Sequence, residues 1–164
     1  MTEQIGDGFD RFVAQRSGRL WRAAWLLTGD RHKAEDLVQT ALAKTYGRYE
    51  MMADDEAYEA YLRVTLYRTY VSWWRRRWNA ELPTADLPEQ PAGTAPSTIS
   101  LDVTRALAEL PRMQRAVLVL RFFEDRSVAD VADALGIAEG SVKTHTSRGC
   151  ARLRGSLHLT EEAS

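Results

Sequence analysis

The sequence predicts an all-α protein of two small helical domains joined by a flexible, proline-rich linker. Apolar residues recur at helical spacing over most of the chain. Four of the five prolines lie in one stretch between residues 79 and 100, so the flanking segments are free to be helical. No segment shows a convincing strand pattern. The predicted first domain covers residues 1–78, the linker 79–99, the second domain 100–157 and a tail 158–164.

Three helices are predicted before the linker. The first ends at Thr28-Gly29 and carries an apolar stripe of Phe9, Phe12, Val13, Leu20, Ala24 and Leu27. Asp30 can cap the second, whose stripe is Ala34, Leu37, Val38, Ala41, Leu42 and Thr45. After Gly47 and the acidic residues 54–56, a long helix is expected from about Ala57 to Trp78, with one face made of Tyr58, Leu62, Leu66, Thr69 and Trp73.

Four helices are predicted after the linker. Ser100 can cap a short first helix, and Pro111 suits the first turn of the second. Their apolar residues are Leu101, Ala106, Leu107 and Leu110, then Met113, Val117, Leu118 and Leu120. Ser127 and Asp130 form a capping box for the third helix, which Gly136 ends. After a tight turn, Ser141 opens a last helix through Arg154, with Val142, Thr146, Gly149 and Leu153 facing inward. This is a helix-turn-helix pattern.

The composition suits a globular chain in a reducing compartment. The longest apolar stretch, Ala23 to Leu27, is far shorter than the roughly 20 residues that a bilayer span requires. Met1 to Asp10 lacks a basic-then-apolar leader. The single Cys150 excludes an internal disulfide. We therefore expect a cytoplasmic protein without membrane contact.

The formal net charge of -1 hides a strong sorting of charge along the chain. Residues 62–80 contain five arginines and no acid, and residues 140–159 contain Lys143, Arg148, Arg152 and Arg154 and no acid. Electrostatics near a surface is local, because the Debye length is about 8 Å at physiological salt. A single charge run is usually a solvated face. Sorting at two sites instead favours two contacts with a polyanion.

The last predicted helix has an outer face suited to DNA. If its apolar side is buried, the helical period places Lys143, Thr144, His145, Ser147 and Arg148 outside. These side chains can bond phosphates and base edges in a major groove, close to the positive end of the helix dipole. An ordinary helical hairpin would share the apolar spacing. The absence of acids on this helix favours DNA.

Aromatic residues interleave with the arginines of the long third helix. They are Tyr58, Tyr61, Tyr67, Tyr70, Trp73, Trp74 and Trp78. One helix face cannot bury all of these rings, and aromatic rings beside arginines can stack unpaired bases. We assign Tyr58 and Trp73 to the core. For the outer rings, core packing and single-strand binding both stay open.

Several motifs resemble the extracytoplasmic-function (ECF, group IV) sigma factors of bacterial RNA polymerase. In the first half these are Gly29-Asp30-Arg31, residues 34–39, Tyr61-Leu62-Arg63 and Trp74-Arg75-Arg76-Arg77, which resemble sigma region two. In the second half, residues 110–115, 118–124 and 140–144 resemble region four. The variants are most similar to the actinobacterial SigE-like subgroup. Both halves occur in family order, which is more specific than either motif alone.

The resemblance implies partners and roles. Asp36, Gln39 and Thr40 would bind core RNA polymerase, whose clamp helices and flap belong to its two large subunits. The melted minus-ten element would be held by Arg63, Tyr67, Arg68, Trp74, Arg75, Arg76 and Arg77. The minus-thirty-five element would be read by Lys143, Thr144, His145, Ser147 and Arg148. The linker would thread through the polymerase, and an anti-sigma factor would clamp both domains.

Two positions depart from the family pattern. The family usually has Glu where Thr40 stands and Asn where Arg68 stands.

The alternative function is a helix-turn-helix regulator outside the polymerase, but residues 1–78 resemble neither a phosphoacceptor nor a ligand domain. An enzyme is disfavoured, since the three histidines lack metal-ligand spacing, Cys150 has no obvious base and no glycine-rich phosphate loop occurs. We expect no metal and no cofactor.

Overall fold

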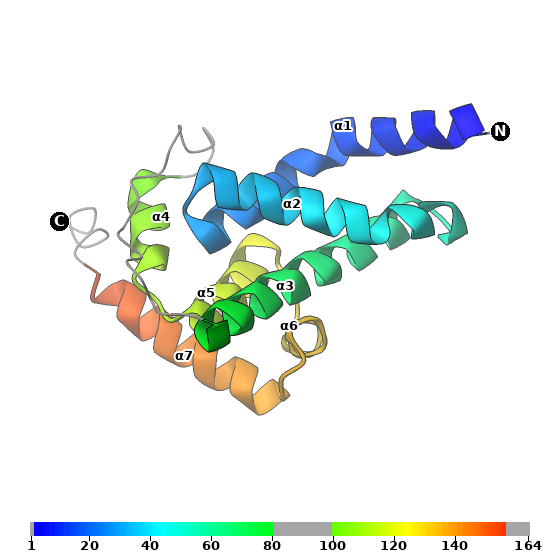
Figure 1. The fold of residues 1–164 in the computed structure, drawn as a ribbon. Coiled ribbons are helices and arrows are strands. Elements are labelled where there is room, and N and C mark those ends of the chain that lie inside the picture. The colour runs from blue at the N-terminus through cyan, green and yellow to red at the C-terminus, as the bar shows by residue number, and fades with distance from the viewer. Residues whose placement is uncertain (1, 81–99, 157–164) are drawn as a thin grey trace.

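The structure, a computed structural model, describes residues 2–80 and 100–156, with the side chains of residues 8–76 and 100–156. Its regular elements in these ranges are all helical, which confirms the all-α fold class (Figure 1). They are α1 (Thr2–Thr28), α2 (Arg31–Thr45), the 3₁₀ turn η1 (Tyr46–Met51), α3 (Asp55–Ala80), α4 (Leu101–Ala108), α5 (Arg112–Leu118), the π-helical turn η2 (Val119–Phe123), α6 (Val128–Leu135) and α7 (Glu139–Arg154). Almost all of the predicted linker and the whole tail lie outside the described residues.

The predicted signals at the ends of the first helices are confirmed. Gly29 follows α1 with a φ of 66°, a left-handed conformation that glycine adopts without strain. The Asp30 carboxylate then accepts hydrogen bonds from the backbone N–H groups of His32 and Lys33, at 2.8 and 3.1 Å. These bonds satisfy two of the free amides at the start of α2. The sequence therefore encodes the sharp turn between α1 and α2.

A cluster of aromatic rings packs α1 against the end of α2, the turn η1 and the start of α3. Phe12 packs edge-on against Tyr58 with ring centres 4.9 Å apart, and Tyr49 of η1 packs against the same ring at 5.1 Å. The Tyr58 hydroxyl lies 2.7 Å from Thr45 Oγ1, inside the core. Tyr58 is thus a core residue, as predicted. The short turn η1, which was not predicted, supplies one wall of this cluster.

The second half follows the predicted order of helices, with three differences. Ser100 and Ser127 cap α4 and α6, and Gly136 ends α6 in the left-handed region at a φ of 68°. Pro111 lies just before α5 rather than in its first turn. The expected continuous helix relaxes into η2 at its end. The last helix begins at Glu139 rather than Ser141, so it carries one acid in its first turn.

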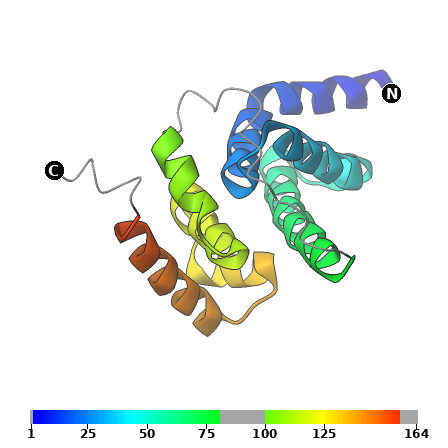
Figure 2. The same cartoon turned by 60° about the vertical axis from the view of Figure 1, so that its left-hand side comes forward.

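The two halves of the described chain pack against each other. Helices α1–α3 lie together on one side and α4–α7 on the other (Figure 2). Helix α1 contacts α4, α5 and η2, while α3 contacts α6. Buried apolar side chains from both halves form one continuous cluster, and the indole Nε1 of Trp25 donates to Thr104 Oγ1 across the boundary at 3.4 Å. The division into domains 1–78 and 100–157 stays a prediction.

Candidate nucleic-acid interface

Helix α7 is held tightly against α5. Val142 and Gly149 are buried on its inner side, while Thr146 and Leu153 are only half-buried. An ideal Cβ on Gly149 would lie 2.8 Å from Leu118 Cδ1 and 3.1 Å from Leu118 Cγ. A side chain at this position would therefore overlap with α5. Gly149 allows the close approach that fixes which face of α7 points outward.

The outer face of α7 carries most of the predicted DNA-reading residues. Lys143, Thr144, Ser147 and Arg148 are exposed, as the helical period indicated. His145 is half-buried, and its Nδ1 is buried without a hydrogen-bond partner. Burial, together with the positive charge of Arg148, lowers the pKa of His145. This histidine therefore lies at the edge of the outer face and favours the neutral form.

Helix α3 buries Tyr67 and Tyr70, which were not assigned to the core, while Trp73, which was assigned to it, is half-buried. Tyr67 is 0% exposed and Tyr70 7%. Burial and the nearby Glu124 carboxylate raise the pKa of Tyr67 well above its usual value. Tyr67 therefore offers no surface to a base in this arrangement, which corrects its placement among the outer rings. Tyr61 and Trp74 are half-buried at the rim.

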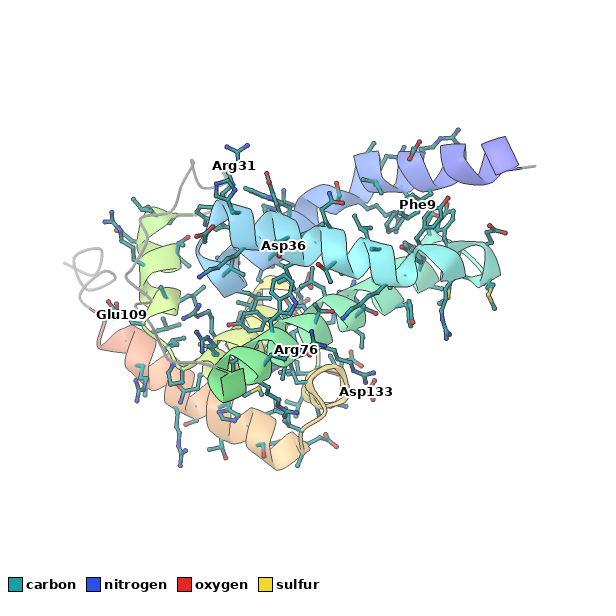
Figure 3. The ribbon with its side chains drawn as sticks, viewed as in Figure 1. Phe9, Arg31, Asp36, Arg76, Glu109 and Asp133 are labelled. Carbon is teal, nitrogen blue, oxygen red and sulfur yellow. The ribbon has the colours of Figure 1, made fainter. Side chains whose placement is uncertain are left out.

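The arginines of α3 divide into two groups. Arg63 and Arg68 contact the second half of the chain, through the Glu124 carboxylate and the backbone carbonyls of Asp133 and Ala134. Arg75 and Arg76 are exposed near the end of the helix, where Figure 3 labels Arg76. The side chain of Arg77 lies outside the described residues. Arg68 is exposed too, but it bonds carbonyls of the second half, so among the described side chains of α3 only Arg75 and Arg76 are exposed arginines outside that contact.

Glu124 is a buried carboxylate that the sequence reasoning did not single out. It directly follows η2 and is 3% exposed, with Arg19 Nε of α1 and Arg63 Nε of α3 at 3.4 and 3.3 Å from its two oxygens. Burial raises the pKa of Glu124, while Arg63 and Arg19 act in the opposite direction. The available signal was an acid directly after residues 117–123, which are apolar except for Arg121. The sequence did not indicate its two arginine partners, because both belong to the first half of the chain.

Helix α2 presents a separate polar surface. Asp36, which Figure 3 labels on α2, and Gln39 are exposed, and Thr40 is half-buried. The opposite side of α2 is the buried stripe that includes Ala34, Leu37 and Val38. The predicted polymerase-binding residues thus lie together on the outside of the first half. They are available without any change in the core.

Among the described residues, no group of three or more His, Cys, Asp or Glu side chains is placed to hold a metal ion. In the same part of the chain, no helix is long and apolar enough to cross a membrane.

Known proteins resemble the chain over most of its length. It is 42% identical to the RNA polymerase sigma-E factor of Streptomyces coelicolor over 154 residues, covering 91% of this chain and 85% of that protein. It is 33% identical to the ECF RNA polymerase sigma factor SigL of Mycobacterium tuberculosis, covering 76% of this chain and 75% of that protein. Residues 100–153 match the family model for region 4 of sigma-70. The chain belongs to the ECF RNA polymerase sigma factors.

The fold agrees with solved sigma factors. The sigma factor RpoE of Bartonella quintana, crystallised with the anti-sigma factor NepR, aligns with a TM-score of 0.73 at 26% identity. The alignment covers 92% of this sigma factor and 97% of RpoE. CnrH, solved with the cytosolic domain of CnrY, has the same fold, with a TM-score of 0.62 at 22% identity. The predicted resemblance to the family is thereby confirmed.

Proposed function

We propose that this sigma factor binds core RNA polymerase and directs promoter-specific initiation by recognising minus-thirty-five and minus-ten DNA and melting the minus-ten region. The observation that carries the proposal is the outer face of α7, the helix that follows α6 after a tight turn. The exposed residues on this face are Lys143, Thr144, Ser147 and Arg148. A helix placed in this way, with cationic and hydroxyl side chains in its first turns, suits a major groove. Residues 100–157 would form the minus-thirty-five domain.

The first half would carry the minus-ten function. Arg75 and Arg76 are exposed on α3, and Trp74 lies half-buried beside them, so backbone phosphates and unstacked bases have cations and a ring to meet. Arg63, Arg68 and Arg77 belong to the same proposed surface. Tyr67 belongs to it only in a form in which its ring is exposed.

The exposed residues of α2 would dock on the clamp helices of the polymerase. Asp36 and Gln39 lie off the buried stripe, so they are free to bond a partner. Region four would contact the polymerase flap, as the family resemblance implies. An anti-sigma factor is a proposed further partner, because the related RpoE was solved in complex with one.

Reconstitution with sigma-free polymerase tests the function. The purified chain should give transcription from discrete sites on genomic DNA, and Asp36→Lys should lower its affinity for core polymerase by at least tenfold, because a reversed charge would face a polar contact site. Glu35→Lys is the matched control, with the same change of charge one residue earlier on α2, and it should retain near wild-type affinity. Circular dichroism verifies that both variants fold. Wild-type affinity in folded Asp36→Lys would refute the docking site, and promoter-independent transcription would refute the function.

A further inference from the structure

The contacts of Glu124 reach across the boundary between the two halves. Its carboxylate lies 3.4 Å from Arg19 Nε and 3.3 Å from Arg63 Nε, and both arginines belong to the first half. Arg19 also donates through Nη2 to the backbone carbonyl of Phe123 at 3.1 Å, next to Glu124. One residue pair of the second half is thus held by two helices of the first.

This network exists only while the halves are docked. A buried carboxylate is costly unless cations and donors surround it. Glu124 is 3% exposed, and the side chain of Arg63 is 14% exposed. If the halves separate, water reaches Glu124 and Arg63 as it already reaches the half-exposed Arg19, and the Tyr67 ring loses its cover. Removing the charge of Glu124 would therefore weaken docking without disturbing the inner packing of either half.

The docked half occupies the cations of α3 that face it. The Glu124 carboxylate offers Arg63 the same kind of acceptor as a phosphate, a pair of anionic oxygens. One turn further on, Arg68 Nη2 donates to the Asp133 carbonyl at 3.0 Å and Nε to the Ala134 carbonyl at 3.4 Å. These carbonyls lie at the negative end of α6, which favours a cation. Arg63 cannot serve a DNA strand while it makes this contact, whereas Arg68 stays exposed with part of its guanidinium committed to these carbonyls.

We propose that Glu124 latches the second half of the chain onto the α3 surface formed by Arg63, Tyr67 and Arg68, so that docking of the halves and binding of a melted DNA strand there exclude each other. The nucleic-acid part of this inference rests on the proposed function of α3. The partner of this surface in the free protein is the chain's own second half.

A distance measurement tests the latch. Spin labels on Ala43→Cys of α2 and Ala151→Cys of α7, both exposed, report the separation of the halves in a Cys150→Ser background. The wild type should show a dominant short distance, and Glu124→Gln should shift population to long distances. Arg19→Gln should do the same while leaving the DNA-facing residues intact. Arg16→Gln is the matched control, because Arg16 lies on α1 and pairs at 2.7 Å with Glu59 of the first half.

A binding measurement on the same variants tests the competition. A single-stranded oligonucleotide with the minus-ten sequence should bind Glu124→Gln and Arg19→Gln about tenfold more tightly than the wild type, because apparent affinity scales with the open fraction. Arg16→Gln should match the wild type. The oligonucleotide should also lengthen the distance in the wild-type chain, since the coupling is reciprocal.

The outcomes separate the latch from the proposed function. Unchanged distances in both Glu124→Gln and Arg19→Gln would overturn the latch. Longer distances without tighter oligonucleotide binding would overturn the competition. If no form of the chain binds the oligonucleotide, the proposed role of α3 fails, while the distances still decide whether Glu124 holds the halves together.

Discussion

Replacing Gly149 with alanine probes the contact that orients α7. The added methyl would lie 2.8 Å from Leu118 Cδ1 and 3.1 Å from Leu118 Cγ. Rotation about χ2 of Leu118 moves Cδ1 but leaves Cγ in place, and a change of χ1 has no room because the side chain is 3% exposed, so α7 must shift away from α5. Overpacking of this kind costs about 1 to 3 kcal/mol. Alanine recovers up to about 1 kcal/mol through helix propensity.

Gly140→Ala is the matched control for this change. Gly140 lies in the first turn of the same helix, and a Cβ there would meet nothing within 4 Å. It should therefore be neutral or slightly stabilising. The difference in free energy of unfolding between the two variants, about 1 to 3 kcal/mol, isolates the clash because both carry the same substitution.

Urea denaturation followed by far-ultraviolet circular dichroism measures this difference, and tryptophan fluorescence reports separately on the first half, which holds all five tryptophans. A second test couples the two positions. Leu118→Ala removes the atoms that clash, so it should cost less in the Gly149→Ala background than in the wild type. If Gly149→Ala is as stable as Gly140→Ala, or if the two substitutions are additive, the close approach of α5 and α7 is wrong.

Two further predictions concern the outer face of α7. Arg148→Ala should cost about 1 to 3 kcal/mol of binding free energy on a preferred minus-thirty-five duplex and little on a scrambled duplex. Arg152→Ala, one turn further along α7, should weaken binding to both duplexes alike. Titrations at fixed salt measure these losses, and equal losses for Arg148→Ala on the two duplexes would mean that Arg148 only positions the protein. The lowered pKa of His145 means that the unfolded state takes up a proton first as pH falls below about 6.5, so folding stability contributed by this residue is present above that pH and lost below it. His145→Gln should lose less stability than the wild type between about pH 7.5 and 5.5 in urea titrations, and identical pH profiles would refute this.

Local signals predicted the helices well because their causes are local. Asp30, Ser100 and Ser127 cap the helices that they were expected to cap, since each cap needs only amides two or three residues further on. Gly136 ends α6 for the same kind of reason. The predicted start of α7 was wrong by two residues, because Ala138, the residue before the helix, makes no side-chain capping bond that would mark the position. The turns η1 and η2 have no simple apolar period, so the pattern did not reveal them.

The candidate site was less predictable, because burial on α3 depends on the other half. Helical spacing indicated the inner face of Tyr58, Leu62 and Leu66, and this face is buried. The same spacing cannot show that α6 and Glu124 of the second half contact a second face, next to Tyr67 and Arg68. The same residue pattern fits a helix with two buried faces and a helix with one core face and one binding face. The sequence alone therefore does not distinguish them.

The basic stretch of α3 therefore has two uses that composition alone cannot separate. All five arginines look equivalent in the sequence, as cations without neighbouring acids. The structure distinguishes the four whose side chains it describes by what lies opposite them. Arg63 meets a carboxylate and Arg68 meets helix-end carbonyls, whereas Arg75 and Arg76 meet solvent. In the docked chain, the Glu124 carboxylate offsets the charge of Arg63, while Arg68, Arg75 and Arg76 still contribute to long-range attraction of DNA. Arg63 would add its contact only after the halves separate, which makes opening part of the affinity for melted DNA.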